Sequence, residues 1–228
     1  SAALPHELRT PLAAIQGYAE VLRDDWDQLS TSEGHQMLDK ILAATDRLKR
    51  LSENYAMYVE LESHSDEALA SKSAPAVAST PRIEEVANAQ ADDHGRRDDL
   101  QCTVAPAALE AEERYVCCLV NELVDNAFKF SASGYAVRVM GTEAEDGYRL
   151  RVVDQGRGMN AQQVKQLGAF VQFNRTEYEQ QGVGLGLALV HRIVEHSGGT
   201  ITITSTPGAG TTVEVRLPTA NSSSTGHD

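Results

Sequence analysis

Residues 121–130 read NELVDNAFKF, and the spacing of the apolar side chains in this stretch predicts an α-helix. One stripe of that helix is apolar and is expected to be buried, with Val120, Leu123, Val124 and Ala127 as its members. Glu122 and Asn126 are four residues apart and project from one face, together with the nearby Lys129. A carboxylate, an amide oxygen and an ammonium group on one face suit Mg²⁺ bound to phosphates, because magnesium prefers oxygen ligands and shares them with its substrate. An ordinary polar helix face gives the same pattern, so the neighbouring motifs must decide.

The next motif, DQGRGM at residues 154–159, directly follows a predicted strand at 150–153. A buried carboxylate at the end of a strand can accept a hydrogen bond from an exocyclic amine, and we assign this role to Asp154. Gly156 and Gly158 allow the backbone to approach a flat base closely. Turns with this pattern are common, so the motif on its own is weak evidence.

A third motif, GVGLGL at residues 182–187, precedes a predicted helix at 188–196. Backbone N–H groups at the start of a helix bind anions, and the helix dipole favours negative charge there. The loop lacks the Lys-Ser/Thr pair of a P-loop. It also follows the polar stretch 176–181, whereas a dinucleotide-binding loop directly follows a strand.

Helices and strands alternate between residues 100 and 218. The predicted strands are 100–104, 136–140, 148–153, 200–204 and 211–217. The predicted helices are 112–129, 160–167 and 185–196, with a further helix that begins at Thr80-Pro81 and a hairpin turn at 142–147. This order predicts an α+β sandwich with helices on one face of a mixed sheet.

The first sixty residues predict two helices joined at the polar stretch 27–32, where a serine or threonine can cap the second helix. Each helix carries an apolar stripe: Leu8, Leu12, Ile15, Ala19, Leu22 and Trp26 in the first, and Leu38, Ile41, Leu48, Tyr55 and Val59 in the second. A single antiparallel hairpin cannot bury both stripes. We therefore expect an all-α hairpin that pairs with a second copy as a four-helix bundle.

These observations divide the chain into a helical hairpin at 1–61, a linker at 62–79, an α+β domain at 80–219 and a disordered tail at 220–228. The proposed linker is rich in serine and alanine, which make up ten of its eighteen residues.

The formal net charge of −13 argues against a protein that binds nucleic acid or docks on an anionic membrane surface. Cys102, Cys117 and Cys118 show no metal-binding spacing and read as small buried side chains in a reducing compartment. No apolar run approaches the length of a membrane span. We therefore predict a cytoplasmic protein without direct membrane contact in these residues.

Taken together with GAGT at 208–211, before the last strand, the three motifs resemble the ATPase superfamily shared by gyrase, a heat-shock chaperone, mismatch-repair ATPases and histidine kinases. The resemblance covers roughly 110–218 and implies an ATP-binding sandwich of the Bergerat type. It implies that Asn126 holds Mg²⁺ and that Asp154 contacts the adenine amine. It further implies that Lys129 contacts phosphates, that Phe130 lies beside the base and that Thr211 supports the adenine pocket.

The same resemblance implies that the glycine loop covers the phosphates, through Gly182, Gly184, Gly186 and Leu187. Residues 161–181 are then a mobile lid, and FVQF at 170–173 resembles the phenylalanine-bearing box of histidine kinases. Within the lid, Arg175 is a candidate phosphate contact.

The heptapeptide HELRTPL at residues 6–12 selects one branch of that superfamily, because it resembles the phosphoacceptor box of histidine kinases. A neutral imidazole is a competent nucleophile toward phosphorus, which suits His6. Glu7 can accept the proton of the other ring nitrogen, and Thr10 lies one helical turn from the histidine. Pro11 is expected to bend the helix just after the site.

The resemblance implies an ATP-dependent autokinase that phosphorylates His6 and passes the phosphoryl group to an aspartate of a response regulator. It also implies a homodimer, an upstream sensing part and a phosphatase activity in which Thr10 positions water. Two residues depart from the family pattern. Pro5 stands where the family usually has a small polar residue, and Glu122 stands where many members have asparagine.

Glu122 resembles the carboxylate that orients water in hydrolytic members of the superfamily. This leaves open an ATPase that drives a conformational change, in place of a kinase. A catalytically silent dimeric scaffold is the other alternative. The intact acceptor box and nucleotide motifs argue against both.

Overall fold

The computed structural model describes residues 3–63, 77–79, 81–170 and 185–219. The chain forms two compact units, whose described residues are 3–60 and 185 in unit 1, and 61–63, 77–79, 81–170 and 186–219 in unit 2.

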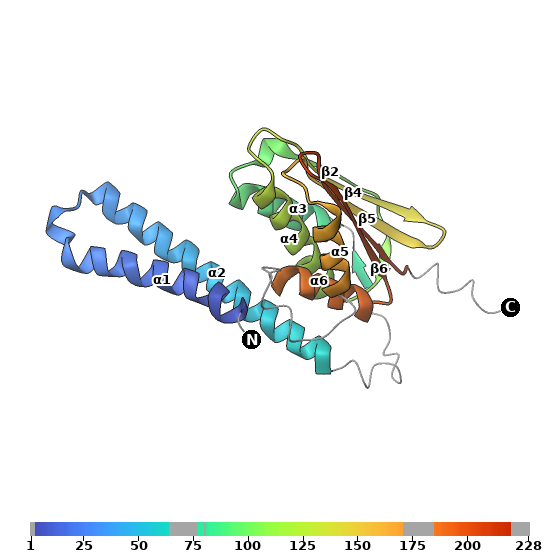
Figure 1. The fold of residues 1–228 in the computed structure, drawn as a ribbon, viewed down its shortest axis with the longest axis horizontal. Coiled ribbons are helices and arrows are strands. Elements are labelled where there is room, and N and C mark those ends of the chain that lie inside the picture. Colours follow the sequence, from blue (N-terminus) through green and yellow to red (C-terminus); the bar gives the residue numbers. More distant parts are fainter. Residues whose placement is uncertain (1–2, 64–76, 80, 171–184, 220–228) are drawn as a thin grey trace. The chain divides into compact units, whose positions relative to one another are not determined.

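Unit 1 is a helical hairpin of α1 (Ala3–Asp24) and α2 (Thr31–Ser63), with the short 3₁₀ helix η1 (Trp26–Gln28) between them (Figure 1). A reciprocal pair of hydrogen bonds fixes the start of α2. The backbone N–H of Glu33 donates to Ser30 Oγ (3.2 Å), and the backbone N–H of Ser30 donates to the Glu33 carboxylate (2.9 Å). The predicted cap within 27–32 is thus confirmed, and Ser30 provides it.

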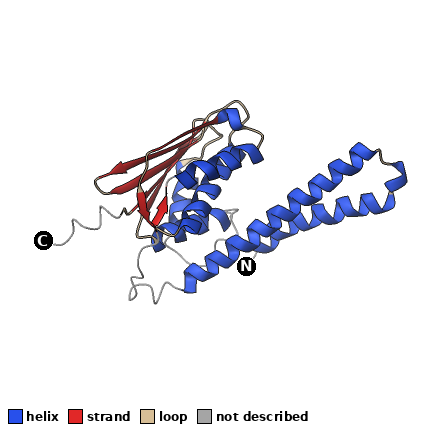
Figure 2. Cartoon of the chain, turned by 180° about the vertical axis from the view of Figure 1, so that it is seen from behind, coloured by secondary structure: helices blue, strands red, loops and turns tan. Residues whose placement is uncertain are grey.

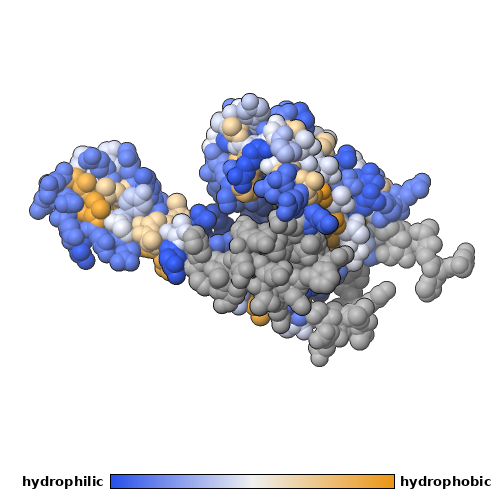
Figure 3. Space-filling model, in the orientation of Figure 1, coloured by the Kyte–Doolittle hydropathy of each residue, from blue (hydrophilic) through white to orange (hydrophobic). Residues whose placement is uncertain are grey.

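Large apolar side chains of the hairpin remain exposed in the single chain. They are Leu12 (50% exposed), Val21 (37%), Trp26 (61%), Leu38 (43%), Leu42 (62%), Tyr55 (46%) and Val59 (46%). Figure 3 shows hydrophobic side chains on the face of the hairpin that is turned to the viewer. The hairpin therefore carries apolar surface that its own two helices do not bury, as the stripes in the sequence predicted.

Unit 2 is built on a five-stranded sheet with the strand order β2-β4-β5-β7-β6. The strands are β2 (Leu100–Val104), β4 (Val137–Ala144), β5 (Gly147–Val153), β6 (Thr200–Thr206) and β7 (Gly210–Leu217). β2 and β4 are parallel and the other neighbours are antiparallel, which confirms the predicted mixed sheet. The turn between β4 and β5 contains only Glu145 and Asp146, and is therefore tighter than the predicted turn at 142–147.

The helices of unit 2 are α3 (Pro81–Asp93), η2 (Arg97–Asp99), α4 (Glu113–Phe130), α5 (Ala161–Phe170) and α6 (Leu185–His196). α3, α4 and α6 lie on one face of the sheet, as Figure 2 shows. The core between the two layers is aliphatic, and its members include Ile83, Leu119, Val120, Val124, Val139, Leu150, Leu189 and Ile193. This arrangement confirms the predicted α+β sandwich.

Two short strands lie outside the main sheet. β1 (Val77–Ser79) pairs in antiparallel fashion with β3 (Ala108–Glu110). β1 falls within the range predicted as a linker. A three-residue strand has no periodicity of its own, so its pairing depends on a partner some thirty residues away in the sequence. None of the described helices is both long and apolar enough to span a lipid bilayer.

Candidate functional site

Asp154 follows the last residue of β5 and is buried, with 9% of its surface exposed. Its Oδ1 accepts hydrogen bonds from the backbone N–H of Gly156 (2.7 Å) and of Thr211 (3.3 Å). Burial raises the pKa of this carboxyl, and the two backbone hydrogen bonds act in the opposite direction. No further hydrogen bond joins the carboxylate to a described residue, so Oδ2 can accept one from an amine.

The glycines after Asp154 are required by neighbouring backbone. A Cβ on Gly156 would lie 2.2 Å from the carbonyl oxygen of Phe130 at the end of α4. Gly158 has a φ of +62°, and a Cβ there would lie 2.0 Å from the carbonyl oxygen of Thr206. The turn is thus wedged between α4 and β6. The predicted contact of these glycines with a base stays a prediction.

Thr211 lies in β7 beside a serine that the motifs did not predict. Ser205 Oγ accepts a hydrogen bond from the backbone N–H of Met159 (2.8 Å) and donates one to the carbonyl of Gly210 (2.9 Å). It also lies 2.9 Å from Thr211 Oγ1. Ser205 therefore joins the turn after β5 to β6 and β7. Its sequence context gave no signal, because a serine in an alternating strand has no motif of its own.

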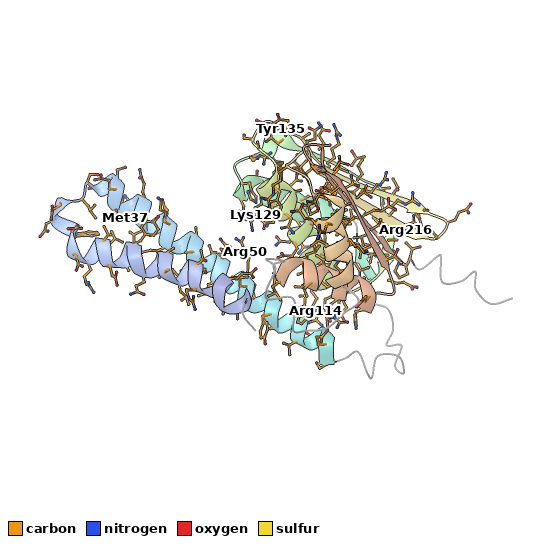
Figure 4. The ribbon with its side chains drawn as sticks, in the orientation of Figure 1. Met37, Arg50, Arg114, Lys129, Tyr135 and Arg216 are labelled. Atoms are coloured by element: carbon orange, nitrogen blue, oxygen red, sulfur yellow. The ribbon has the colours of Figure 1, made fainter. Side chains whose placement is uncertain are left out.

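Glu122, Asn126, Lys129 and Phe130 lie on α4. The predicted stripe of α4 is buried, with Val120, Leu123, Val124 and Ala127 each at most 3% exposed. Within the described residues the Asn126 amide makes no hydrogen bond. Lys129, labelled in Figure 4, is exposed in the last turn of the helix.

Gly186 and Leu187 are the predicted loop residues that the structure describes. A Cβ on Gly186 would lie 1.9 Å from Glu122 Oε2, so the first turn of α6 packs directly against the Glu122 carboxylate. Gly186 and Leu187 both belong to α6. One turn before Glu122 on α4, burial raises the pKa of the Cys118 thiol to about 12, and the Glu122 charge contributes to the rise. This thiol is thus inert at neutral pH. Cys102, Cys117 and Cys118 are each half-buried, so the prediction of buried side chains was too strong.

Phe130 is 41% exposed at the C-terminal end of α4. The Arg157 guanidinium lies 4.7 Å from the centre of its ring, and Lys129 Nζ lies 5.7 Å from the same point. Arg157 was not predicted as a site residue. Arg157 lies in the turn after β5, and no sequence pattern near Phe130 predicts that the two side chains are in contact.

The donor set on α4 fits magnesium. Asn126 offers an amide oxygen, and Glu122 offers a carboxylate one turn earlier. The described residues hold no cluster of three or more His, Cys, Asp or Glu side chains that could enclose a metal ion. A Mg²⁺ ion held mainly by phosphates needs only one or two protein oxygens, and Asn126 meets that need.

The acceptor box lies in unit 1. His6 lies in α1, and the structure describes its backbone but not its side chain. Glu7 is partly exposed and Thr10 is exposed, one turn after His6. Pro11 lies inside α1 and is buried. Arg175, Gly182 and Gly184 are outside the described residues, and so is the lid after Phe170.

Two family models match the chain. The family described as "Histidine kinase-, DNA gyrase B-, and HSP90-like ATPase" matches residues 112–221. The "His Kinase A (phospho-acceptor) domain" matches residues 1–64. The chain belongs to the sensor histidine kinases. This kinase thus carries an acceptor domain and an ATPase domain in the order that the motifs predicted.

Curated relatives of this kinase are also histidine kinases. The histidine protein kinase DivJ of Caulobacter vibrioides is 32% identical over 94% of this chain and 36% of the relative. Sensor histidine kinase ZraS of Escherichia coli is 30% identical over 96% of this chain and 44% of the relative. The kinase chain therefore spans less than half the length of these relatives.

Solved structures share the fold of this kinase. The histidine kinase AdeS of Acinetobacter baumannii has a TM-score of 0.66 at 19% identity and covers 97% of this chain and 100% of its own. The mycobacterial sensor histidine kinase MprB has a TM-score of 0.53 at 26% identity, over 63% of this chain and 97% of its own.

Proposed function

We propose that this chain transfers the γ-phosphoryl group of ATP to His6 and then to an aspartate of a response regulator. The observation that carries the proposal is the buried Asp154 carboxylate, whose Oδ1 is held by two backbone N–H groups while Oδ2 stays open to an amine. An acceptor box on α1 of the same chain provides the second half of the reaction.

In this proposal the adenine amine donates to Asp154, and Phe130 lies beside the base. Lys129 and Arg175 contact phosphates, and the glycine loop with Leu187 covers them. Asn126 holds Mg²⁺, which neutralises phosphate charge when it is bound. Phosphoryl transfer depends mostly on positioning and charge neutralisation, so the chain needs no further reactive group at the donor.

At the acceptor, a ring nitrogen of His6 attacks the γ-phosphorus, the bond to the β–γ bridging oxygen breaks and ADP leaves. Glu7, the next residue on α1, accepts the proton of the other ring nitrogen. Because ATP is the donor, we expect the reaction to take place in the cytoplasm.

Incubation with γ-labelled ATP tests the proposal. The wild-type chain is expected to acquire a label that is stable in base and lost in acid, and His6→Gln is expected to acquire none. His35→Gln is the matched control, since His35 is an exposed histidine on α2 of the same hairpin. Equal labelling of His6→Gln and wild type would sink the assignment of the acceptor.

We further propose a homodimer through the hairpin, supported by the exposed apolar side chains of α1 and α2. Leu42→Glu places a charge on the most exposed of them and is expected to shift the chain to a monomer in sedimentation equilibrium. Gln36→Glu adds the same charge at an exposed polar position of α2 and is expected to leave the dimer intact. A wild-type chain that sediments as a monomer at micromolar concentration contradicts this part.

ATP hydrolysis is a second candidate, favoured by the carboxylate of Glu122 beside Gly186. The same labelling experiment separates the two. Phosphate released to solvent without a phosphorylated protein supports hydrolysis, and label retained on the chain supports the kinase. Loss of regulator dephosphorylation in Thr10→Ala would assign the phosphatase activity to the acceptor helix.

A further inference from the structure

Outside the predicted site, Arg96 donates hydrogen bonds through all three nitrogens of its guanidinium group. It follows α3 after Gly95, whose φ of +62° turns the chain, and its side chain is 9% exposed. Such a buried guanidinium must find acceptors for all five of its N–H groups, because an unsatisfied one loses its hydration without compensation.

Most of those acceptors are backbone carbonyls in the last turn of α4 and in the loop that follows it. Nη1 donates to the carbonyls of Phe128 (2.9 Å) and Ser131 (2.9 Å), and Nη2 donates to those of Ala132 (2.7 Å) and Tyr135 (3.1 Å). The last carbonyls of a helix have no partner within the helix, and a cation near them also opposes the negative end of the helix dipole. Arg96 is therefore the C-terminal cap of α4, supplied from thirty residues upstream.

The cap is itself held in place. Arg96 Nε donates to Asp99 Oδ2 (2.7 Å), and the guanidinium lies 4.9 Å from the centre of the Phe128 ring. Asp99 also accepts from the backbone N–H of Gly134 (3.0 Å), in the loop after α4. These contacts with Arg96 and Gly134 lower the pKa of the Asp99 carboxyl, so it remains ionised and keeps orienting the arginine at neutral pH.

The turn of α4 that Arg96 caps contains Lys129 and Phe130. Figure 4 labels Lys129 on α4 and Tyr135 in the loop that follows. Phe130 is joined to the nucleotide motif after β5, because its carbonyl accepts a hydrogen bond from the backbone N–H of Arg157 (3.2 Å). If the last turn of α4 lost its fixed conformation, Lys129 and Phe130, which are assigned to the phosphates and the base, would therefore move.

Asn126 and Glu122 lie one and two turns earlier, where α4 is held by other contacts. Val120, Leu123 and Val124 are buried there, and His94 Nε2 lies 2.9 Å from Asp125 Oδ1. The middle of α4 therefore keeps its place when the last turn loosens.

We propose that Arg96 is a positioning residue of the nucleotide site: it holds the end of α4 and so places Lys129 and Phe130 for ATP. This inference rests on the proposed ATP-dependent function. It assigns to Arg96 an effect on nucleotide affinity rather than on the transfer step, since the residues nearest the transferred group are held independently.

The test compares Arg96→Ala, Arg96→Lys and Arg97→Ala in the whole chain. Arg97 is the adjacent arginine, 52% exposed, and it pairs with Asp92 (2.7 Å), so it controls for loss of an arginine and an ion pair. Arg96→Ala is expected to raise the KM for ATP at least about tenfold while kcat at saturating ATP stays within about twofold. Arg96→Lys is expected to fall between Arg96→Ala and wild type, because an ammonium keeps the charge without the planar fork.

A second comparison asks whether Arg96 acts through the last turn. In a Phe130→Ala, Lys129→Ala background, Arg96→Lys is expected to change ATP affinity less than about twofold, measured by calorimetric titration. An effect as large as in the wild-type background overturns the proposal. So does wild-type KM in Arg96→Lys, or a fall in kcat without a rise in KM.

If Arg96→Ala does not fold, the KM for ATP is measured in Arg96→Lys and Asp99→Asn instead, since Asp99 orients the guanidinium. Both variants are expected to raise it. A wild-type chain that fails to bind ATP overturns the proposed function together with this inference. Wild-type binding that the Arg96 variants share overturns the inference alone.

Discussion

Gly186 and Glu122 stand in direct contact across two helices: a Cβ at Gly186 would lie 1.9 Å from Glu122 Oε2. The glycine is the second residue of α6, at the end of the loop assigned to the phosphates, and the carboxylate lies on α4 one turn before Asn126. The obstructing atom belongs to a flexible side chain, so an added methyl group displaces the carboxylate and leaves the two helices in place.

Gly186→Ala is therefore expected to slow autophosphorylation roughly 10- to 100-fold by moving the Glu122 carboxylate. In a Glu122→Ala background the same glycine substitution is expected to cost less than about twofold, because the obstructed atoms are gone. Single-turnover labelling of all four chains measures this coupling. Gly17→Ala is the control for a glycine in a helix with nothing within 4 Å of the added carbon. Equal effects of Gly186→Ala in both backgrounds would contradict the contact.

Asp154→Asn is expected to weaken ATP binding by about 10- to 100-fold, as judged from the value of a hydrogen bond to a charged group. The substitution puts an NH₂ group where the adenine amine needs an acceptor. The free energy of unfolding is expected to stay equal or to rise, since burial raises the pKa of Asp154 and the charged form is therefore costly in the folded state.

Calorimetric titration and urea unfolding check these two expectations for Asp154→Asn. Asp146→Asn is the matched control, because Asp146 is an exposed aspartate paired with Arg216 (2.7 Å) in the same unit. Wild-type affinity in Asp154→Asn would remove Asp154 from the site.

Local patterns in the sequence predicted most of the sheet and the buried face of α4. β2 has the predicted bounds, and the stripe of α4 is buried as its spacing required. The resemblance placed both Asp154 and Thr211 at the adenine pocket. In the structure the two residues share a hydrogen bond, although 57 residues separate them. Such elements are predictable because short-range periodicity or a fixed motif encodes them.

Contacts that depend on tertiary packing were not predictable in the same way. Arg96 reaches carbonyls 32 to 39 residues away, and Ser205 bonds to Met159 across 46 residues. Neither residue type marks its role, since an arginine after a helix and a serine in a strand are ordinary. The partner in each of these hydrogen bonds is a backbone group, which carries no sequence signature.

Gly210 and Gly208 provide a matched pair for the loop that supports Asp154. Both have positive φ, +98° and +74°, but a Cβ on Gly210 would lie 2.0 Å from the Asp154 carbonyl oxygen, and one on Gly208 meets nothing within 4 Å. Gly208→Ala is expected to cost about 1 kcal/mol for its backbone conformation alone. Gly210→Ala adds an overlap with backbone and is expected to cost about 2–5 kcal/mol. Urea unfolding measures both, and equal losses would argue against the packing of this loop on Asp154.

His191 on α6 links stability to pH. Both of its ring nitrogens are buried and have no hydrogen-bond partner among the described residues. Burial lowers the pKa of His191 from 6.5 to about 4, so below pH 6.5 the unfolded chain binds the proton more readily than the folded one. The stabilising contribution of the neutral ring is therefore complete above that pH and is lost as the pH falls toward 4.

The expected loss from this single group is about 1–3 kcal/mol between pH 7 and pH 4. It is isolated as the difference between wild type and His191→Leu in calorimetric unfolding at a series of pH values. Because leucine does not titrate, His191→Leu is expected to show a shallower decline over this window, with the two curves running parallel above pH 7. His35→Gln, at an exposed site on α2, is expected to follow the wild-type curve throughout. A decline in His191→Leu as steep as that of the wild type would assign the acid sensitivity of the fold to other groups.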